Sequence, residues 1–182
     1  MNKKHVLPAL IILALSFGFI LSGIAKWSAD TKNAKVDFVL PTEPHKLSFS
    51  GLTADIVFDA ADLKHSEIIA RIDVSTLATE DLGLTKHLLS ADFLDADKFP
   101  QIKFISSRIE KTGEGYTAYG ALAMKDSVHA VAIPFTFDQV GKKGTFKGKF
   151  SIFSGDYGVM KKSKSGKDQV DITLEIPVNR SK

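Results

Sequence analysis

The sequence predicts an all-β domain of about eight antiparallel strands with one short helix, and three observations support this fold class. Apolar and polar residues alternate along most of the chain, as they do in strands with one buried face. The connections at residues 112–115, 125–127 and 141–144 are short and turn-like, which favours hairpins between neighbours. Strands with one apolar face must bury that face, so we expect either a sandwich or a closed barrel.

The first 25 residues do not follow this pattern. Lys3 and Lys4 precede an uncharged run over residues 6–25, and these 20 residues would span about 30 Å as a helix, the thickness of a bilayer core. Since positive charge before such a run stays cytoplasmic, we expect the rest of the chain to be exported to the periplasm or cell envelope. The length of the run favours an uncleaved membrane anchor, whereas Ser22, Gly23 and Ala25 favour a signal peptide cleaved after Ala25. We therefore assign residues 1–25 to a signal peptide or membrane-anchoring helix and residues 26–182 to the β domain.

In the first half of the domain, alternating apolar residues predict strands over residues 36–40, 47–49, 56–58 and 68–74. Leucines then recur at near-helical spacing, so a helix is expected over residues 80–90. Thr79 is the expected N-cap, and Glu80 and Asp81 suit the positive end of the helix dipole. Pro100 bars helix continuation and is tolerated at the first residue of a strand.

In the second half, apolar residues predict strands over residues 102–104, 116–124, 131–137, 146–152 and 170–178. Several candidates for the inner face are small, namely Ala70, Ala118, Gly120 and Gly148. Such residues fit both an interior with room for a ligand and close packing against phenylalanine. The lysine-rich segment 154–168 is too long for a tight turn, and we interpret it either as a solvated mobile loop or as a lid at a barrel mouth.

Charge is distributed unevenly along the exported part. Residues 26–140 carry 12 Lys/Arg and 17 Asp/Glu, a net charge of −5, whereas residues 141–182 carry 10 and 4, a net charge of +6. We favour pairing of oppositely charged neighbouring strands over a basic patch that faces a membrane surface. Nucleic-acid binding is not expected, because aromatic residues are not interleaved with the basic ones.

The sequence offers few candidates for catalysis. The absence of cysteine excludes thiol nucleophiles, disulfides and thiolate metal sites. The five histidines show no i, i+2 or i, i+4 pair, and no G-x-S-x-G elbow is present. A hydrolase that uses His87 with Ser90 or Ser106 is the enzymatic alternative. We expect a protein that is not an enzyme and that holds neither a metal nor a cofactor.

The segment around Pro100 suggests a family. The chain resembles the YceI-like family of exported, lipocalin-like barrels, and the similarity extends over residues 27–178. The matching motifs are Lys86-His87-Leu88-Leu89-Ser90, Asp92-Phe93-Leu94-Asp95, Phe99-Pro100-Gln101-Ile102-Lys103-Phe104 with Ser106, Gly120-Ala121-Leu122 and Asp156-Tyr157-Gly158, together with Trp27.

The resemblance implies an eight-stranded antiparallel barrel whose tunnel binds a long apolar lipid of the polyisoprenoid or isoprenoid-quinone type. As carrier, store or stress-related binding protein it would meet lipid at a membrane surface, and a homodimer is one option for an oligomeric state that we leave open. The alternative is an interaction or structural protein of the envelope with a packed core. Leu89 and Ser154 stand where the family tends to have arginine. The residues expected to line the tunnel are Phe38, Ile72, Phe93, Phe104, Leu122, Phe135, Phe150 and Ile172.

Overall fold

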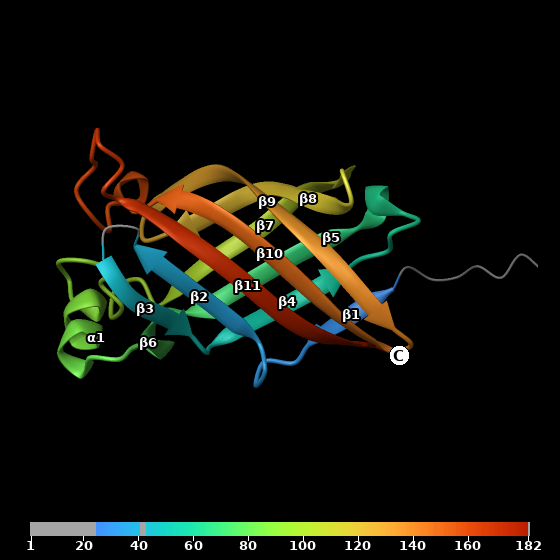
Figure 1. The fold of residues 1–182 in the computed structure, drawn as a ribbon, viewed down its shortest axis with the longest axis horizontal. Coiled ribbons are helices and arrows are strands. Elements are labelled where there is room, and N and C mark those ends of the chain that lie inside the picture. The colour runs from blue at the N-terminus through green and yellow to red at the C-terminus, as the bar shows by residue number, and fades with distance from the viewer. Residues whose placement is uncertain (1–24, 41–42, 182) are drawn as a thin grey trace, which may run out of the picture.

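The computed structural model describes residues 25–40 and 43–181, which form a closed antiparallel barrel with one α-helix (Figure 1). Residues 1–24 of the expected signal peptide or anchor lie outside the described residues. Its last residue, Ala25, is described: it is buried, and its carbonyl accepts from the N–H of Phe58 at 3.0 Å. Among the residues that are described, no helix is long and apolar enough to cross a membrane. The strand segments are β1 (Lys26–Ala29), β2 (Lys35–Leu40), β3 (Glu43–Phe49), β4 (Leu52–Val57), β5 (Glu67–Asp73), β6 (Leu77–Thr79), β7 (Gln101–Thr112), β8 (Gly115–Met124), β9 (Ser127–Val140), β10 (Lys143–Phe153) and β11 (Gln169–Arg180).

Three pairs of these segments act as single interrupted strands. β1 and β2 both pair with β11, at its end and its beginning respectively. β4 pairs with β1 and β3 pairs with β2, so β3 and β4 together form the next strand of the barrel. β5 pairs with β4 and β6 pairs with β3, so β5 and β6 together form the strand after it. Counting each pair as one strand gives an up-and-down barrel of eight strands, which confirms the predicted strand number and antiparallel arrangement.

The interruptions occur where the local sequence leaves strand geometry. Residues 30–34 form a turn between β1 and β2, in which Asn33 and Ala34 donate backbone hydrogen bonds to the carbonyl of Asp30. Gly51 separates β3 from β4, and its N–H donates to the Thr76 hydroxyl at 2.9 Å. The 3-10 turn η2 (Val74–Thr76) separates β5 from β6, so Val74, predicted as the end of a strand, lies in a turn instead.

Helix α1 (Leu82–Leu89) confirms the predicted helix, but the predicted N-cap is wrong. The Asp81 carboxylate, not Thr79, accepts from the N–H groups of Gly83 and Leu84 at 2.6 and 3.1 Å. The Thr79 hydroxyl instead lies 3.0 Å from the Thr85 hydroxyl and donates to the Asp81 carbonyl, which ties β6 to the helix. The helix therefore starts two residues later than the cap prediction required.

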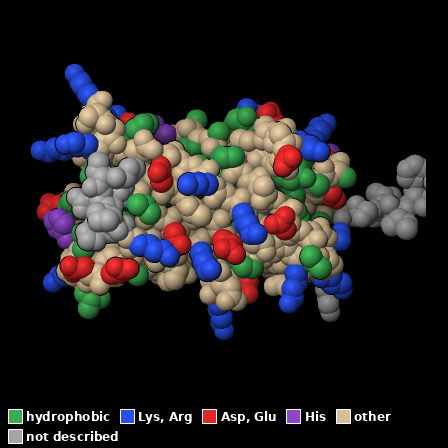
Figure 2. Space-filling view, viewed as in Figure 1, with side chains coloured by type: hydrophobic (Ala, Val, Ile, Leu, Met, Phe, Trp, Pro, Cys, Tyr) green, Lys and Arg blue, Asp and Glu red, His purple; other side chains and the backbone are tan. Residues whose placement is uncertain are grey.

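Oppositely charged side chains pair across neighbouring strands on the outer face. Lys35 and Glu175 lie 3.9 Å apart between β2 and β11, and Lys147 and Asp138 lie 3.4 Å apart between β10 and β9. Figure 2 shows basic and acidic side chains interspersed over this side of the molecule. These contacts favour the pairing interpretation of the uneven charge over a single basic patch.

Candidate ligand tunnel

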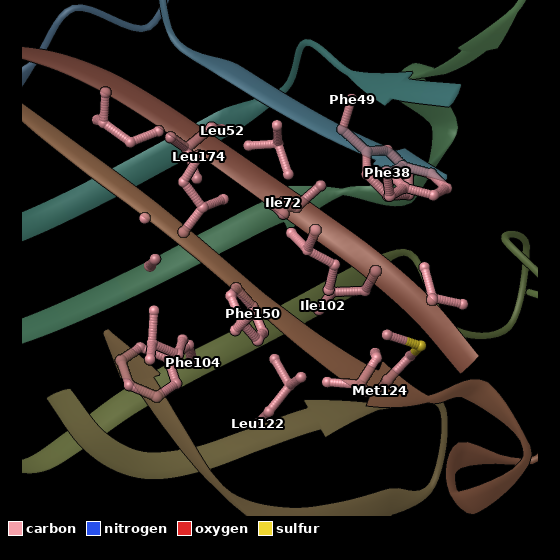
Figure 3. A pocket seen from close by; sticks show the side chains of 18 of the residues that line it. Phe38, Phe49, Leu52, Ile72, Ile102, Phe104, Leu122, Met124, Phe150 and Leu174 are labelled. Carbon is pink, nitrogen blue, oxygen red and sulfur yellow. The ribbon is translucent and has the colours of Figure 1, made fainter. Parts of the chain in front are cut away.

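The inward-facing side chains enclose an elongated apolar cavity instead of filling the barrel. The cavity has a volume of about 230 Å³. It is lined by residues from every strand segment except β1, which bears Trp27 at the closed end. Of the described residues in its wall, only Lys147 and Ser154 have polar side chains. Figure 3 shows labelled side chains of opposite walls, such as Ile72 and Phe150, pointing into the common interior.

All eight residues expected to line a tunnel lie in the wall of this cavity, namely Phe38, Ile72, Phe93, Phe104, Leu122, Phe135, Phe150 and Ile172. Their contact with a ligand stays a prediction. The alternation of strand residues would also have found further wall residues such as Val36, Phe49 and Leu174. Val159 and Met160, in contrast, come from the polar segment after β10, where no periodic pattern marks them as inward-facing.

The small inward-facing residues serve both purposes that the sequence allows, which are room for a ligand and close packing. Ala70, Ala118 and Gly148 lie in the cavity wall. Gly120 instead lies tightly against β7, because a Cβ atom there would overlap the carbonyl oxygen of Ile105 and lie 2.8 Å from Cε2 of Phe104. The interior is therefore open along part of its length and tightly packed elsewhere.

One end of the cavity is closed by aromatic rings. The Phe58 ring, 1 % exposed, lies within 5.0–5.6 Å of the rings of Tyr116, Phe135, Phe137 and Phe146, all four in edge-to-face geometry with interplanar angles of 69–82°. Trp27 adds an edge-to-face contact with Phe137 at 5.0 Å and donates from Nε1 to the carbonyl of Phe58 at 2.9 Å. We call these six residues the aromatic plug. Trp27 lies on β1 opposite Arg180 of β11, and Figure 1 shows the end of the barrel at which these two strands meet.

The opposite end is the mouth, and two segments cover it. The first consists of α1 and residues 90–99, from which Leu88, Phe93 and Leu94 line the cavity. The second is the 3-10 turn η3 (Ser154–Tyr157) with the loop that follows it, from which Val159 and Met160 line the cavity. The two segments lie at the same end of the barrel in Figure 1. These wall contacts favour the lid interpretation of segment 154–168 over a freely solvated loop.

The base of this lid is held by hydrogen bonds, some of them buried. The Ser154 hydroxyl and its N–H donate to the carbonyl of Asp168 at 2.9 and 2.8 Å, and both residues are buried. His129 Nε2 donates to the carbonyl of Asp156 at 3.0 Å, and its ring lies edge-on to Tyr157 at 4.9 Å. Burial raises the pKa of the Tyr157 phenol, and the nearby Asp156 carboxylate raises it further.

The positions that depart from the family pattern lie at this mouth. Ser154 is in the cavity wall but its hydroxyl is used within the lid, so the residue presents a small neutral group where an arginine would present a cation. Leu89 is half-buried against the core.

The candidate hydrolytic residues are engaged in other contacts. His87 is exposed with its ring against Phe93, at 4.6 Å between centroids, and the Ser90 hydroxyl donates to the backbone carbonyl of His87. The Ser106 hydroxyl accepts from the N–H of Ile68. Within residues 25–40 and 43–181, no group of three or more His, Asp or Glu side chains is arranged to hold a metal ion.

Comparisons with known proteins agree with this geometry. The family model of the YceI-like domain matches residues 27–178. A UPF0312 protein of Pseudomonas syringae pv. tomato is 30 % identical over 186 residues, which cover 96 % of this chain and 97 % of the relative. The crystal structure of BcnA from Burkholderia cenocepacia superimposes with a TM-score of 0.75 at 27 % identity, over 82 % of this chain and 98 % of that one. A polyisoprenoid binding domain from Saccharophagus degradans, implicated in plant cell wall breakdown, shares the fold at 10 % identity with a TM-score of 0.62, over 87 % of this chain and all of the other.

Proposed function

The chain belongs to the YceI-like domain family, and from this premise we propose that it binds a long apolar lipid, of the polyisoprenoid or isoprenoid-quinone type, in the barrel tunnel. One observation carries the proposal: the cavity wall is apolar along its length, with only two polar side chains among its described residues. A polar ligand would lose its hydration there without gaining hydrogen bonds. A hydrocarbon chain makes no hydrogen bonds with water, so its transfer into the tunnel carries no such cost.

The free energy of burying such a chain is sufficient for stable binding. Each buried CH₂ group contributes about 0.8 kcal/mol. About four isoprene units, roughly 20 carbons, therefore contribute on the order of 16 kcal/mol against an association cost of about 4–15 kcal/mol. Because the aromatic plug closes one end, the chain would enter tail first and leave its head group at the mouth.

The test is extraction of purified protein with organic solvent, followed by mass spectrometry, and titration of the extracted protein with a polyprenol. We expect a long-chain lipid in the extract and saturable binding on titration. Recovery of no apolar molecule, together with no binding, would favour the alternative of an envelope interaction protein and overturn lipid carriage.

A matched pair of variants links binding to the tunnel. Ala118 is buried in the wall, whereas Ala121, on the same strand, points outward and is exposed. Ala118→Leu should fill part of the cavity and weaken polyprenol binding at least tenfold, while Ala121→Leu should bind like the parent protein. Equal affinities would show that the ligand sits elsewhere.

We further propose that the protein acts in the cell envelope, as a carrier or store, and that it is not an enzyme. The support is the charged and apolar pattern of the first 25 residues and the hydrogen-bonding of Ser90 and Ser106 to backbone groups. Sequencing the N-terminus of the mature protein separates cleavage after Ala25 from a retained anchor. Esterase activity that disappears in His87→Ala would contradict the non-enzymatic role.

A further inference from the structure

Lys125 occupies a backbone position that its side chain disfavours. It lies in the two-residue turn that joins β8 to β9, with a φ of 54°, in the left-handed region that favours glycine. A non-glycine residue held there carries strain that the surrounding structure must offset. Turn geometry alone therefore does not account for a lysine at this position.

The Lys125 side chain reaches two backbone carbonyls at the tunnel mouth. Its Nζ donates to the carbonyl of Phe93 at 2.6 Å and to the carbonyl of Gly158 at 3.0 Å. The same ammonium group lies 6.0 Å from the centre of the Phe99 ring, and Lys125 is half-buried. Hydrogen bonds from a charged donor are about twice as strong as neutral ones.

The two carbonyls belong to the two segments that cover the mouth. Phe93 itself lines the cavity, and Gly158 directly precedes Val159, which lines it from the other side. Each segment also has backbone hydrogen bonds within itself. The N–H of Leu94 donates to the carbonyl of Leu88, and the N–H of Val159 donates to the carbonyl of Ser154. Among the described residues, Lys125 alone hydrogen-bonds to both segments.

We propose that Lys125 is a latch that holds the two mouth segments together and so controls the rate at which the bound lipid enters and leaves. The inference rests on the proposed function of the tunnel, whose exchange it regulates. Separation of the segments requires the ammonium group to give up at least one carbonyl. Removal of the ammonium group should therefore accelerate opening.

The kinetic test uses N-phenyl-1-naphthylamine, an apolar dye that fluoresces when it leaves water. The protein is loaded with the dye and mixed with excess phosphatidylcholine vesicles in a stopped-flow instrument, which measures the rate at which the dye leaves the protein. Lys125→Met keeps the aliphatic stem and removes the hydrogen-bond donor. We expect dye release from this variant to be about tenfold faster, because a hydrogen bond to a charged group shifts an equilibrium between closed and open segments by more than a factor of ten. Lys98→Met is the matched control: Lys98 lies on the same mouth segment, over the Phe99 ring at 5.0 Å, and is exposed. Its release rate should stay within about twofold of the parent rate.

A second variant separates the latch from the stability of the fold. Lys125→Gly removes the same bonds but relieves the left-handed backbone, so its melting temperature should lie above that of Lys125→Met. Release from Lys125→Gly should nevertheless be as fast as release from Lys125→Met. Parent-like release from both variants would overturn the latch.

Hydrogen exchange of the ligand-free proteins keeps this test independent of lipid binding. We expect the amides of Leu94 and Val159 to exchange faster in Lys125→Met than in the parent protein, with amides of β7 unchanged. If the dye fails to bind the parent protein, the proposed function of the tunnel is contradicted while the exchange data still decide the latch. Unchanged exchange at both amides would refute the latch even if the tunnel binds lipid.

Discussion

Gly120 on β8 lies where backbone and ring leave no space for a side chain. A Cβ atom there would lie 2.8 Å from both Phe104 Cε2 and Ser106 Cα, and closer still to the carbonyl oxygen of Ile105. Since backbone atoms cannot move aside without disturbing the β7–β8 ladder, we expect Gly120→Ala to lower the free energy of unfolding by about 3 kcal/mol. Urea unfolding measures this change. Ala121→Val, on the exposed face next to it, should change stability by less than about 0.5 kcal/mol.

Asp171 on β11 supplies a pH-dependent contribution from the outer face. A hydrogen bond from the Ser151 hydroxyl, followed by one from Gln169, holds the pKa of the Asp171 carboxyl below its usual range. This stabilisation is present above the pKa of the unfolded state and is lost as the pH falls through the lower pKa of the folded state. Ser151→Ala should raise the pKa of Asp171, as followed by NMR titration. The stability difference between variant and parent should be present at pH 6 and should shrink as the pH is lowered towards 2; a difference independent of pH would assign it to another cause.

Individual residues were predictable from sequence wherever a strand pattern placed them. Phe104, Leu122 and Ile172 follow directly from alternation, and each lies in the cavity wall. Met160 and Lys125 do not, because their roles depend on long-range contacts between a loop and a turn that carry no periodic signal. The short range of local sequence patterns explains why the strand residues of the wall were predictable, whereas at the mouth only Phe93, through the family motif, was predicted by residue.

At the scale of elements, α1 depends on a single side chain for its start. The Asp81 carboxylate accepts from two N–H groups that the helix cannot satisfy itself. Asp81→Ala should therefore destabilise the protein by about 1 kcal/mol, measured by urea unfolding. Asp81→Asn retains the acceptor and should recover most of this loss. If both variants behave alike, the charge on Asp81 matters more than its hydrogen bonds.

The boundaries between elements were harder to predict than the elements themselves. Alternation predicts a strand on each side of Gly51. It does not predict that β3 pairs with β2 while β4 pairs with β1. Likewise, either threonine or aspartate suits an N-cap, so only the hydrogen bonds distinguish Asp81 from Thr79. β1 was missed because four residues are too few to show a period.

At the scale of the whole molecule, the aromatic plug closes the barrel and stabilises it. Phe58 contacts four other rings and is almost fully buried. Phe58→Ala should cost about 3–5 kcal/mol of unfolding free energy and should open the closed end to water. Phe58→Leu fills more of the space and should cost less than Phe58→Ala. Calorimetric unfolding tests the order, and equal costs for the two variants would mean that ring contacts, more than volume, hold this end.

The pairing of β1 with β11 determines how the chain can fold. Trp27 lies opposite Arg180, and the N–H of Ser181 donates to the carbonyl of Lys26, so the first and last described strands complete one another. Hairpins such as β8–β9 can form early and locally. The pairing of β1 with β11 can form only when the final residues of the domain are available. Contacts between such distant positions slow folding, since loop-closure entropy is lost before they form. Until then the apolar inner face stays open at one seam, which makes the interval before ring closure the period in which the chain is most exposed to aggregation and most accessible to chaperones.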